Sequence, residues 1–129
     1  MDVGRWFEKA ERFRRAAYSE LEAGRYDIAC FMAQQAAELA LKGCLIRLTG
    51  SRPYTHLLSE LLEILFRVSG ERDEGALACA RVLEEHHLQA RYPNARMKDY
   101  LRAEAEEAIR CMEAILGYVG RVLGAGREG

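Results

Sequence analysis

Strand-forming residues and prolines are scarce in this sequence. Valine, isoleucine and threonine are few, no stretch alternates strictly between apolar and polar residues, and the only prolines are Pro53 and Pro93. β-Branched residues favour strands and proline interrupts helices, so these absences argue against a β fold and for long helices. Alanine, leucine, glutamate and arginine are abundant instead, and all four favour helices. The composition therefore predicts an all-α protein.

Long apolar runs and an excess of one charge are also absent. No apolar run approaches the ~18 residues that cross a membrane, and no such run follows the charged start of the chain as in a signal peptide. We therefore expect a cytoplasmic protein without a membrane segment. The net charge is −1, with 19 basic and 20 acidic residues, which excludes a globally basic nucleic-acid binder but allows a local basic patch.

The cysteines form no C-x-x-C motif of the kind that binds zinc or performs redox chemistry. There are four, and they are widely spaced: Cys30, Cys44, Cys79 and Cys111. Each stands among apolar or alanine neighbours on a helical pattern. We therefore expect small buried thiols in a reducing compartment rather than zinc ligands or disulfides. No metal and no cofactor are expected.

Apolar residues recur every three or four positions in five segments, which is the spacing of amphipathic helices. The predicted helices are residues 5–23, 28–48, 56–69, 74–88 and 100–123. Asp27, Thr55 and Asp73 are the expected N-caps of the second, third and fourth helices. Short connections predict an antiparallel, up-and-down bundle of four or five helices, forming one domain over residues 1–124. Residues 125–129 are predicted to be a flexible tail.

The second predicted helix is apolar on two faces. It is therefore surrounded, either inside the bundle or between the bundle and a partner subunit. Small residues that would let another helix approach run along it: Ala33, Ala36, Ala37, Ala40 and Gly43. Glycine inside a helix costs about 1 kcal/mol relative to alanine, so a close contact is the expected reason for Gly43. This pattern suggests a homodimer through the second helix, while Gln34 and Gln35 are expected to satisfy hydrogen bonds.

Three segments of the chain carry patterns that belong together. Residues 26–42 read YDIACFMAQQAAELALK, residues 55–58 read THLL, and residues 90–95 read ARYPNA. In order and spacing, the three segments resemble HEPN domains, which are small helical bundles found in prokaryotes and in some large eukaryotic proteins. The resemblance implies a homodimeric bundle of four to five helices.

The resemblance also carries expectations about function. HEPN proteins are often encoded beside a small nucleotidyltransferase, and the pair resembles a toxin and its antitoxin. The family name records an older proposal of nucleotide binding. We therefore expect a dimeric interaction module that binds a nucleotide or RNA and partners a nucleotidyltransferase. The alternative is a metal-independent endoribonuclease toxin, because many family members cut RNA with an arginine followed four to six residues later by a histidine.

Arg81 followed by His86 and His87 matches that arginine–histidine spacing, so these are the candidate catalytic residues. A histidine near neutral pKa can take a proton from a 2′-hydroxyl or give one to the leaving oxygen, and an arginine can hold the phosphate. On a continuous helix, however, Arg81 faces away from His86 by roughly 140° and from His87 by roughly 120°. The alternative is that both histidines cap and pack the end of the fourth helix.

A cluster of basic and aromatic residues follows and is the predicted nucleotide- or RNA-binding site. Its members are Arg91, Tyr92, Arg96, Lys98 and Arg102. Arginines beside aromatic rings can hold phosphates and stack bases, although a solvated loop tip explains the same pattern. Tyr92 is also the first candidate acceptor if a partner regulates the protein by nucleotidyl transfer. His56 is expected to be a packed, hydrogen-bonded residue.

Overall fold

The computed structural model describes residues 2–128, with side chains as far as residue 124, and all regular structure in this part of the chain is helical. The helices are α1 (Val3–Glu22), α2 (Tyr26–Thr49), α3 (Leu58–Ser69), α4 (Glu74–Glu84), α5 (His86–Gln89) and α6 (Arg102–Glu128). The predicted all-α bundle is confirmed. The predicted fourth helix is divided into α4 and α5 at Glu85.

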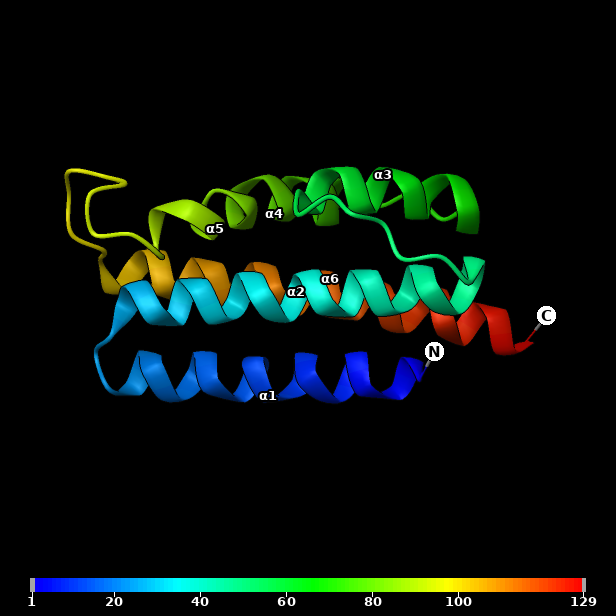
Figure 1. Ribbon diagram of the computed structural model, residues 1–129, viewed down its shortest axis with the longest axis horizontal. Helices are drawn as coiled ribbons and strands as arrows, with labels where there is room; N and C mark the ends of the chain where they lie inside the picture. Colours follow the sequence, from blue (N-terminus) through cyan, green and yellow to red (C-terminus); the bar gives the residue numbers. More distant parts are fainter. Residues whose placement is uncertain (1, 129) are drawn as a thin grey trace.

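The helices form three layers, with α2 and α6 in the middle, α1 on one side and α3 to α5 on the other (Figure 1). Residues 50–57 run back along the bundle without regular structure, so α3 runs in the same direction as α2. The loop between α5 and α6 projects from the end of the bundle that also holds the α1–α2 turn. This end brings together segments that are far apart in the sequence.

The helix starts agree only partly with the predicted caps. Asp73 is the N-cap of α4, because its carboxylate accepts a hydrogen bond of 3.0 Å from the amide three residues later. Asp27 is not a cap, since α2 begins one residue earlier at Tyr26, and its charge instead lies in the positive first turn of the helix. Thr55 accepts a hydrogen bond from a nearby amide, but α3 begins only at Leu58.

The small residues of α2 are buried within the single chain. The four alanines of the predicted stripe are at most 1% exposed. At Gly43, an added Cβ would lie 3.0 Å from the Cβ of Trp6 and 3.2 Å from the ring of Phe7, both in α1. Close packing of α1 therefore explains Gly43, and α2 is the central helix of the bundle. A homodimer through α2 stays a prediction.

The cysteines differ from the expectation of four free thiols. Cys30 and Cys44 are free and buried, and burial raises the pKa of Cys30 to about 12 and that of Cys44 to about 11. The prediction is wrong for Cys79 and Cys111, which form a disulfide between α4 and α6. They are 32 residues apart in the sequence, but the two helices bring their Cα atoms to 4.8 Å, a separation typical of disulfides.

The last helix extends beyond its predicted end at residue 123. α6 reaches Glu128, so the predicted tail is helical as far as residue 128, and Gly129 lies outside the described residues. The flexibility of residues 125–129 stays a prediction. Over the described part of the chain, every helix is too short or too polar to cross a membrane.

We expect Gly43→Ala to lower the free energy of unfolding by about 1–3 kcal/mol, because the added methyl group pushes against the Cβ of Trp6, which moves only with α1. The matched control is Gly120→Ala in α6, where a Cβ meets nothing within 4 Å and the better helix propensity of alanine should add up to about 1 kcal/mol. Urea unfolding of both variants measures the difference. Equal stabilisation by both would contradict the close contact between α1 and α2.

Reduction of the disulfide should lower the free energy of unfolding by about 3–4 kcal/mol, because the link closes a loop across 32 residues in the unfolded chain. Thermal unfolding with and without a phosphine reductant measures this effect. The Cys79→Ala/Cys111→Ala variant is the control and should not respond to the reductant. Four titratable thiols in the unreduced, denatured protein would contradict the disulfide.

Candidate functional site

Most of the predicted binding cluster lines one cavity. This cavity, here called the loop cavity, has a volume of about 520 Å³ and lies between the α1–α2 turn and the α5–α6 loop. Its lining includes Arg91, Tyr92, Arg96 and Lys98, together with Tyr26 and Tyr100. Of the five predicted binding residues, only Arg102 is not part of the lining, and its guanidinium lies 3.6 Å from a carboxylate oxygen of Glu106.

Arg96 holds the wall of the loop cavity in shape. Its guanidinium donates hydrogen bonds of 2.7 and 2.8 Å to the carboxylate of Glu104, and further bonds to the backbone carbonyls of Lys98 and Asp99. The same group lies 3.8 Å from the ring centroid of Tyr100. The hydrogen bond from Arg96 lowers the pKa of Glu104 despite partial burial. Arg96 therefore acts as a clamp on the loop rather than as a free cation.

Arg91 and Lys98 are the cations of the loop cavity that are available to a ligand. Both are exposed, and neither forms an ion pair within the described part of the chain. The guanidinium of Arg91 lies 5.0 Å from the ring centroid of Phe31 in α2, which orients it without neutralising its charge. Tyr92 is 50% exposed at the rim. The cavity thus combines two free positive charges with exposed aromatic surface.

The three predicted catalytic residues do not share a site. Arg81 is exposed on α4, whereas His86 is 7% exposed and its Nδ1 lies 2.8 Å from the hydroxyl of Tyr100. Glu85 keeps a helical backbone, with φ −64° and ψ −30°, so no bend turns Arg81 toward the histidines. His87 points elsewhere and stacks on His56, with ring centroids 5.2 Å apart. His86 therefore packs the end of α4 against the loop, as in the alternative interpretation.

The structure contains a buried polar cluster on α2 that the sequence analysis did not predict. Glu38 and Lys42 are each 6% exposed and form an ion pair of 2.9 Å. The same carboxylate accepts a hydrogen bond of 2.8 Å from the side chain of Gln34 and lies 2.8 Å from Nδ1 of His56. These four residues are here called the α2 cluster. The available signal was the spacing of residues 34, 38 and 42, which share one helix face.

Burial and hydrogen bonding have opposite effects in the α2 cluster. Burial raises the pKa of Glu38, but the hydrogen bonds from His56, Lys42 and Gln34 outweigh it and leave the pKa below its ordinary value. Burial lowers the pKa of His87, which stacks over His56. The Nδ1 atom of His87 is buried and has no hydrogen-bond partner among the described residues. His56 is thus hydrogen-bonded, as expected, but its side chain is also 60% exposed.

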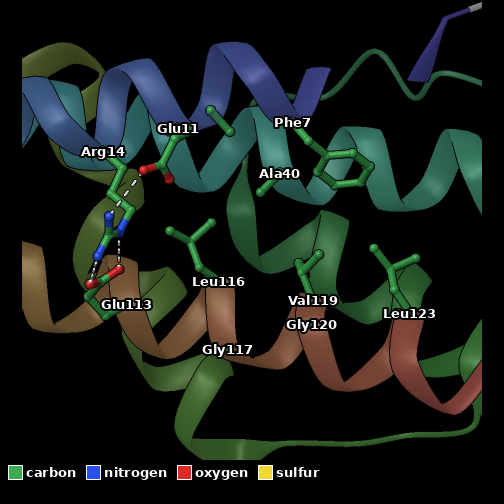
Figure 2. A pocket seen from close by; sticks show the side chains of 11 residues that line it. Phe7, Glu11, Arg14, Ala40, Glu113, Leu116, Gly117, Val119, Gly120 and Leu123 are labelled. Carbon is green, nitrogen blue, oxygen red and sulfur yellow. Dashed lines mark hydrogen bonds and ion pairs between the residues drawn. The ribbon is translucent and has the colours of Figure 1, made fainter. Parts of the chain in front are cut away.

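A groove between α1 and α6 differs from the loop cavity in its charge (Figure 2). Its volume is about 550 Å³, and Phe7, Leu116 and Leu123 give it apolar walls. At one end, Arg14 donates two hydrogen bonds of 2.9 Å to Glu113, which raise the pKa of the guanidinium. Because this cation is already paired, the described residues that line the groove offer no free positive charge to a phosphate. No group of three or more metal-binding side chains is found among the described residues.

The buried His86 and the half-buried His87 should make stability depend on pH between about 7 and 5. Burial lowers the pKa of His86 and of His87, so the folded protein binds fewer protons than the unfolded chain, whose imidazoles titrate near ~6.5. The free energy of unfolding should therefore fall as the pH drops through ~6.5 toward the lower folded values. Urea unfolding between pH 7.5 and 5 tests this, and the His86→Gln/His87→Gln variant should lose most of the dependence. A flat profile in the native chain would contradict it.

Solved structures similar to this chain include three that it covers almost completely. TT1696 from Thermus thermophilus is 35% identical with a TM-score of 0.85, and the match covers 93% of this chain and 97% of that one. ST0689, an archaeal HEPN homologue, is 31% identical with a TM-score of 0.76, and the match covers 95% of this chain and 98% of that one. A HEPN domain protein, TM0613 from Thermotoga maritima, is 25% identical with a TM-score of 0.74, and the match covers 93% of this chain and 98% of that one.

No curated protein matches the chain. A sequence profile of the HEPN domain matches residues 3–122, which include all six helices except the last turns of α6. The three sequence segments that resemble the family lie together in the structure around α2 and the loop cavity. The chain belongs to the HEPN domain family.

Proposed function

We propose that this protein binds the phosphate groups of RNA or of a nucleotide in the loop cavity. The observation that carries the proposal is the convergence of Arg91, Tyr92 and Lys98 on one cavity of about 520 Å³. Arginine and lysine hold phosphates through charge-assisted hydrogen bonds, and exposed aromatic rings stack on bases of any sequence. The ligand is therefore recognised by its charge and its bases.

The contacts around the loop cavity support a binding site that is preorganised before a ligand binds. The clamp from Arg96 to Glu104 fixes the α5–α6 loop before a ligand arrives, so little conformational entropy is lost on binding. Asp27 and Asp99 also line the cavity, and their charges oppose anion binding close to them. The phosphate is therefore expected nearer to Arg91 than to the α1–α2 turn.

The projecting loop also supports the proposal of a protein partner. Met97 is 104% exposed and Leu101 is 62% exposed, and apolar side chains grouped on a projecting loop are typical of protein contacts. A small nucleotidyltransferase and a second copy of this chain are the partners that we propose. Co-purification with a nucleotidyltransferase encoded next to this protein tests the first, and the mass in solution tests the second.

An endoribonuclease built on Arg81 with His86 or His87 is the second candidate function. It has less support, because Arg81 is exposed on α4 while His86 is buried against Tyr100. A ribonuclease that depends on this pair would need α4 and α5 to rearrange.

We expect Arg91→Ala and Lys98→Ala each to weaken the binding of single-stranded RNA by about five- to tenfold at physiological salt, because each removes one phosphate contact. The slope of log affinity against log salt should fall by about 1 in each variant. Fluorescence anisotropy with a labelled RNA measures both quantities. The control is Arg12→Ala, which removes an exposed arginine of α1 far from the cavity lining. Equal affinity of all the variants would refute the binding site.

A further inference from the structure

A surface of arginines and aromatic rings lies toward the end of the bundle opposite the loop cavity, where α1 starts and α2 ends (Figure 1). The guanidinium of Arg52, in the segment of residues 50–57, lies 6.0 Å from the ring centroid of Trp6 and 5.8 Å from that of Tyr54. The guanidinium of Arg47 lies 5.3 Å from the ring centroid of Phe7. These five residues are here called the arginine–aromatic surface.

The two arginines of this surface carry charges that have no partner. Arg47 and Arg52 are exposed, and neither forms an ion pair within the described residues, whereas a guanidinium nitrogen of the nearby Arg5 lies 3.6 Å from the carboxylate of Asp2. Contact with an aromatic ring orients a guanidinium without neutralising it. A guanidinium held in this way can bind a carboxylate through two parallel hydrogen bonds. The surface therefore offers two oriented cations to an acidic group.

The segment that carries Arg52 also has free backbone groups. Residues 51–57 have no regular structure, and exposure alternates within them, because residues 52, 54 and 56 are exposed while Pro53 and Thr55 are half-buried. This alternation is typical of an extended chain. The amides of residues 52, 54 and 56 and the carbonyls of residues 52–56 form no hydrogen bond within the described part of the chain. Such groups can pair with a second extended chain, as in peptides that add a strand to a sheet edge.

These features favour a peptide over a nucleic acid as the ligand of this surface. Single-stranded RNA stacks its bases on open aromatic faces. Phe7 is in contact with both Arg47 and the backbone at Gly43, and Trp6 is half-buried beside Arg52, so neither ring is open for stacking. Carboxylates need only the outward N–H groups of the guanidiniums, and free amides and carbonyls are matched by another peptide backbone.

Tyr54 gives the arginine–aromatic surface an apolar anchor. Its side chain is 85% exposed beside Arg52, and Leu48, next to Arg47 in α2, is 38% exposed. Tryptophan, tyrosine and arginine are the residues that most often carry the binding energy of protein interfaces. The surface thus combines the residue types of a protein contact with an unpaired positive charge.

We propose that the arginine–aromatic surface docks an extended, acidic segment of a partner protein. Carboxylates of that segment bind the guanidiniums of Arg47 and Arg52, its backbone pairs with residues 52–56, and an apolar side chain packs on Tyr54. The surface lies away from the loop cavity and from the projecting loop between α5 and α6. Docking here requires no RNA, so the inference stands independently of the proposed function.

The first experiment selects peptides from a display library of random twelve-residue sequences on the native chain. The selected peptides should be enriched in aspartate and glutamate and poor in proline, because carboxylates and backbone pairing carry the binding. Arg47→Ala/Arg52→Ala should lose this enrichment. The control is Arg110→Ala, which removes an exposed cation of α6 and should keep it. No acidic enrichment on the native chain, or the same peptides on the double variant, would overturn the proposal.

Trp6 is the only tryptophan of the chain, so its fluorescence reports binding at this surface. Titration with one selected peptide that lacks tryptophan should change the emission of Trp6. Arg52→Ala should weaken the affinity by at least about fivefold at an unchanged melting temperature, and Arg52→Lys should recover only part of it, because lysine lacks the planar fork of donors. A peptide that binds without changing the emission of Trp6 binds elsewhere, which would overturn the proposal.

Two further measurements test the pairing and the class of ligand. Amide exchange with solvent, measured by NMR, should slow at residues 52, 54 and 56 when the peptide is bound, and unchanged exchange would overturn the backbone pairing. Single-stranded RNA that changes the emission of Trp6, with an affinity weakened by Arg52→Ala, would assign the surface to nucleic acid. A native dimer that Arg52→Ala converts to a monomer would assign it to a second copy of the chain. Either of these last two results would overturn the acidic partner.

Discussion

The ion pair between Glu38 and Lys42 is the constraint around which the rest of the structure is arranged. Both side chains lie in α2, which is covered by α1, α6 and the layer of α3 to α5. Two opposite charges removed from water are tolerated only if each finds its partner and the remaining hydrogen bonds are satisfied. Gln34 and His56 supply those bonds, so the segment before α3 must return along the bundle to bring His56 to α2. The same return of the chain lets α3 run in the same direction as α2.

The end of the molecule that holds the loop cavity depends on a second network. Arg96 binds Glu104 and two carbonyl groups of its own loop, and His86 reaches the loop through Tyr100. These contacts fix the connection between α5 and α6, which has no regular structure, and keep Arg91 and Lys98 at the cavity. Arg96, which is paired within the protein, is therefore distinct from Arg91 and Lys98, which remain available to a ligand. The same distinction separates the loop cavity from the α1–α6 groove, where Glu113 already pairs Arg14 (Figure 2).

Much of the fold could be predicted from the sequence, because helical periodicity is strong and a glycine with positive φ stands at or just after the C-terminal ends of α1, α2 and α3. Asp73 is a cap as predicted, whereas Asp27 is not, since α2 begins one residue earlier, at Tyr26, without a side-chain cap. The site was harder to predict. The spacing from Arg81 to His86 suggested a catalytic pair, but a helical backbone through Glu85 keeps the two apart. The contact of Glu38 with His56 and the disulfide of Cys79 with Cys111 are long-range, and no local pattern reveals which helices bring them together.

The central claim is that RNA is bound at the end of the bundle formed by the α1–α2 turn and the α5–α6 loop. The most direct measurement is a backbone amide NMR titration of the native chain with a short single-stranded RNA. The account predicts that the largest shift changes fall on the residues around the loop cavity, 26–28 and 89–100. Changes confined to the α1–α6 groove, or no changes at all at millimolar RNA, would contradict it.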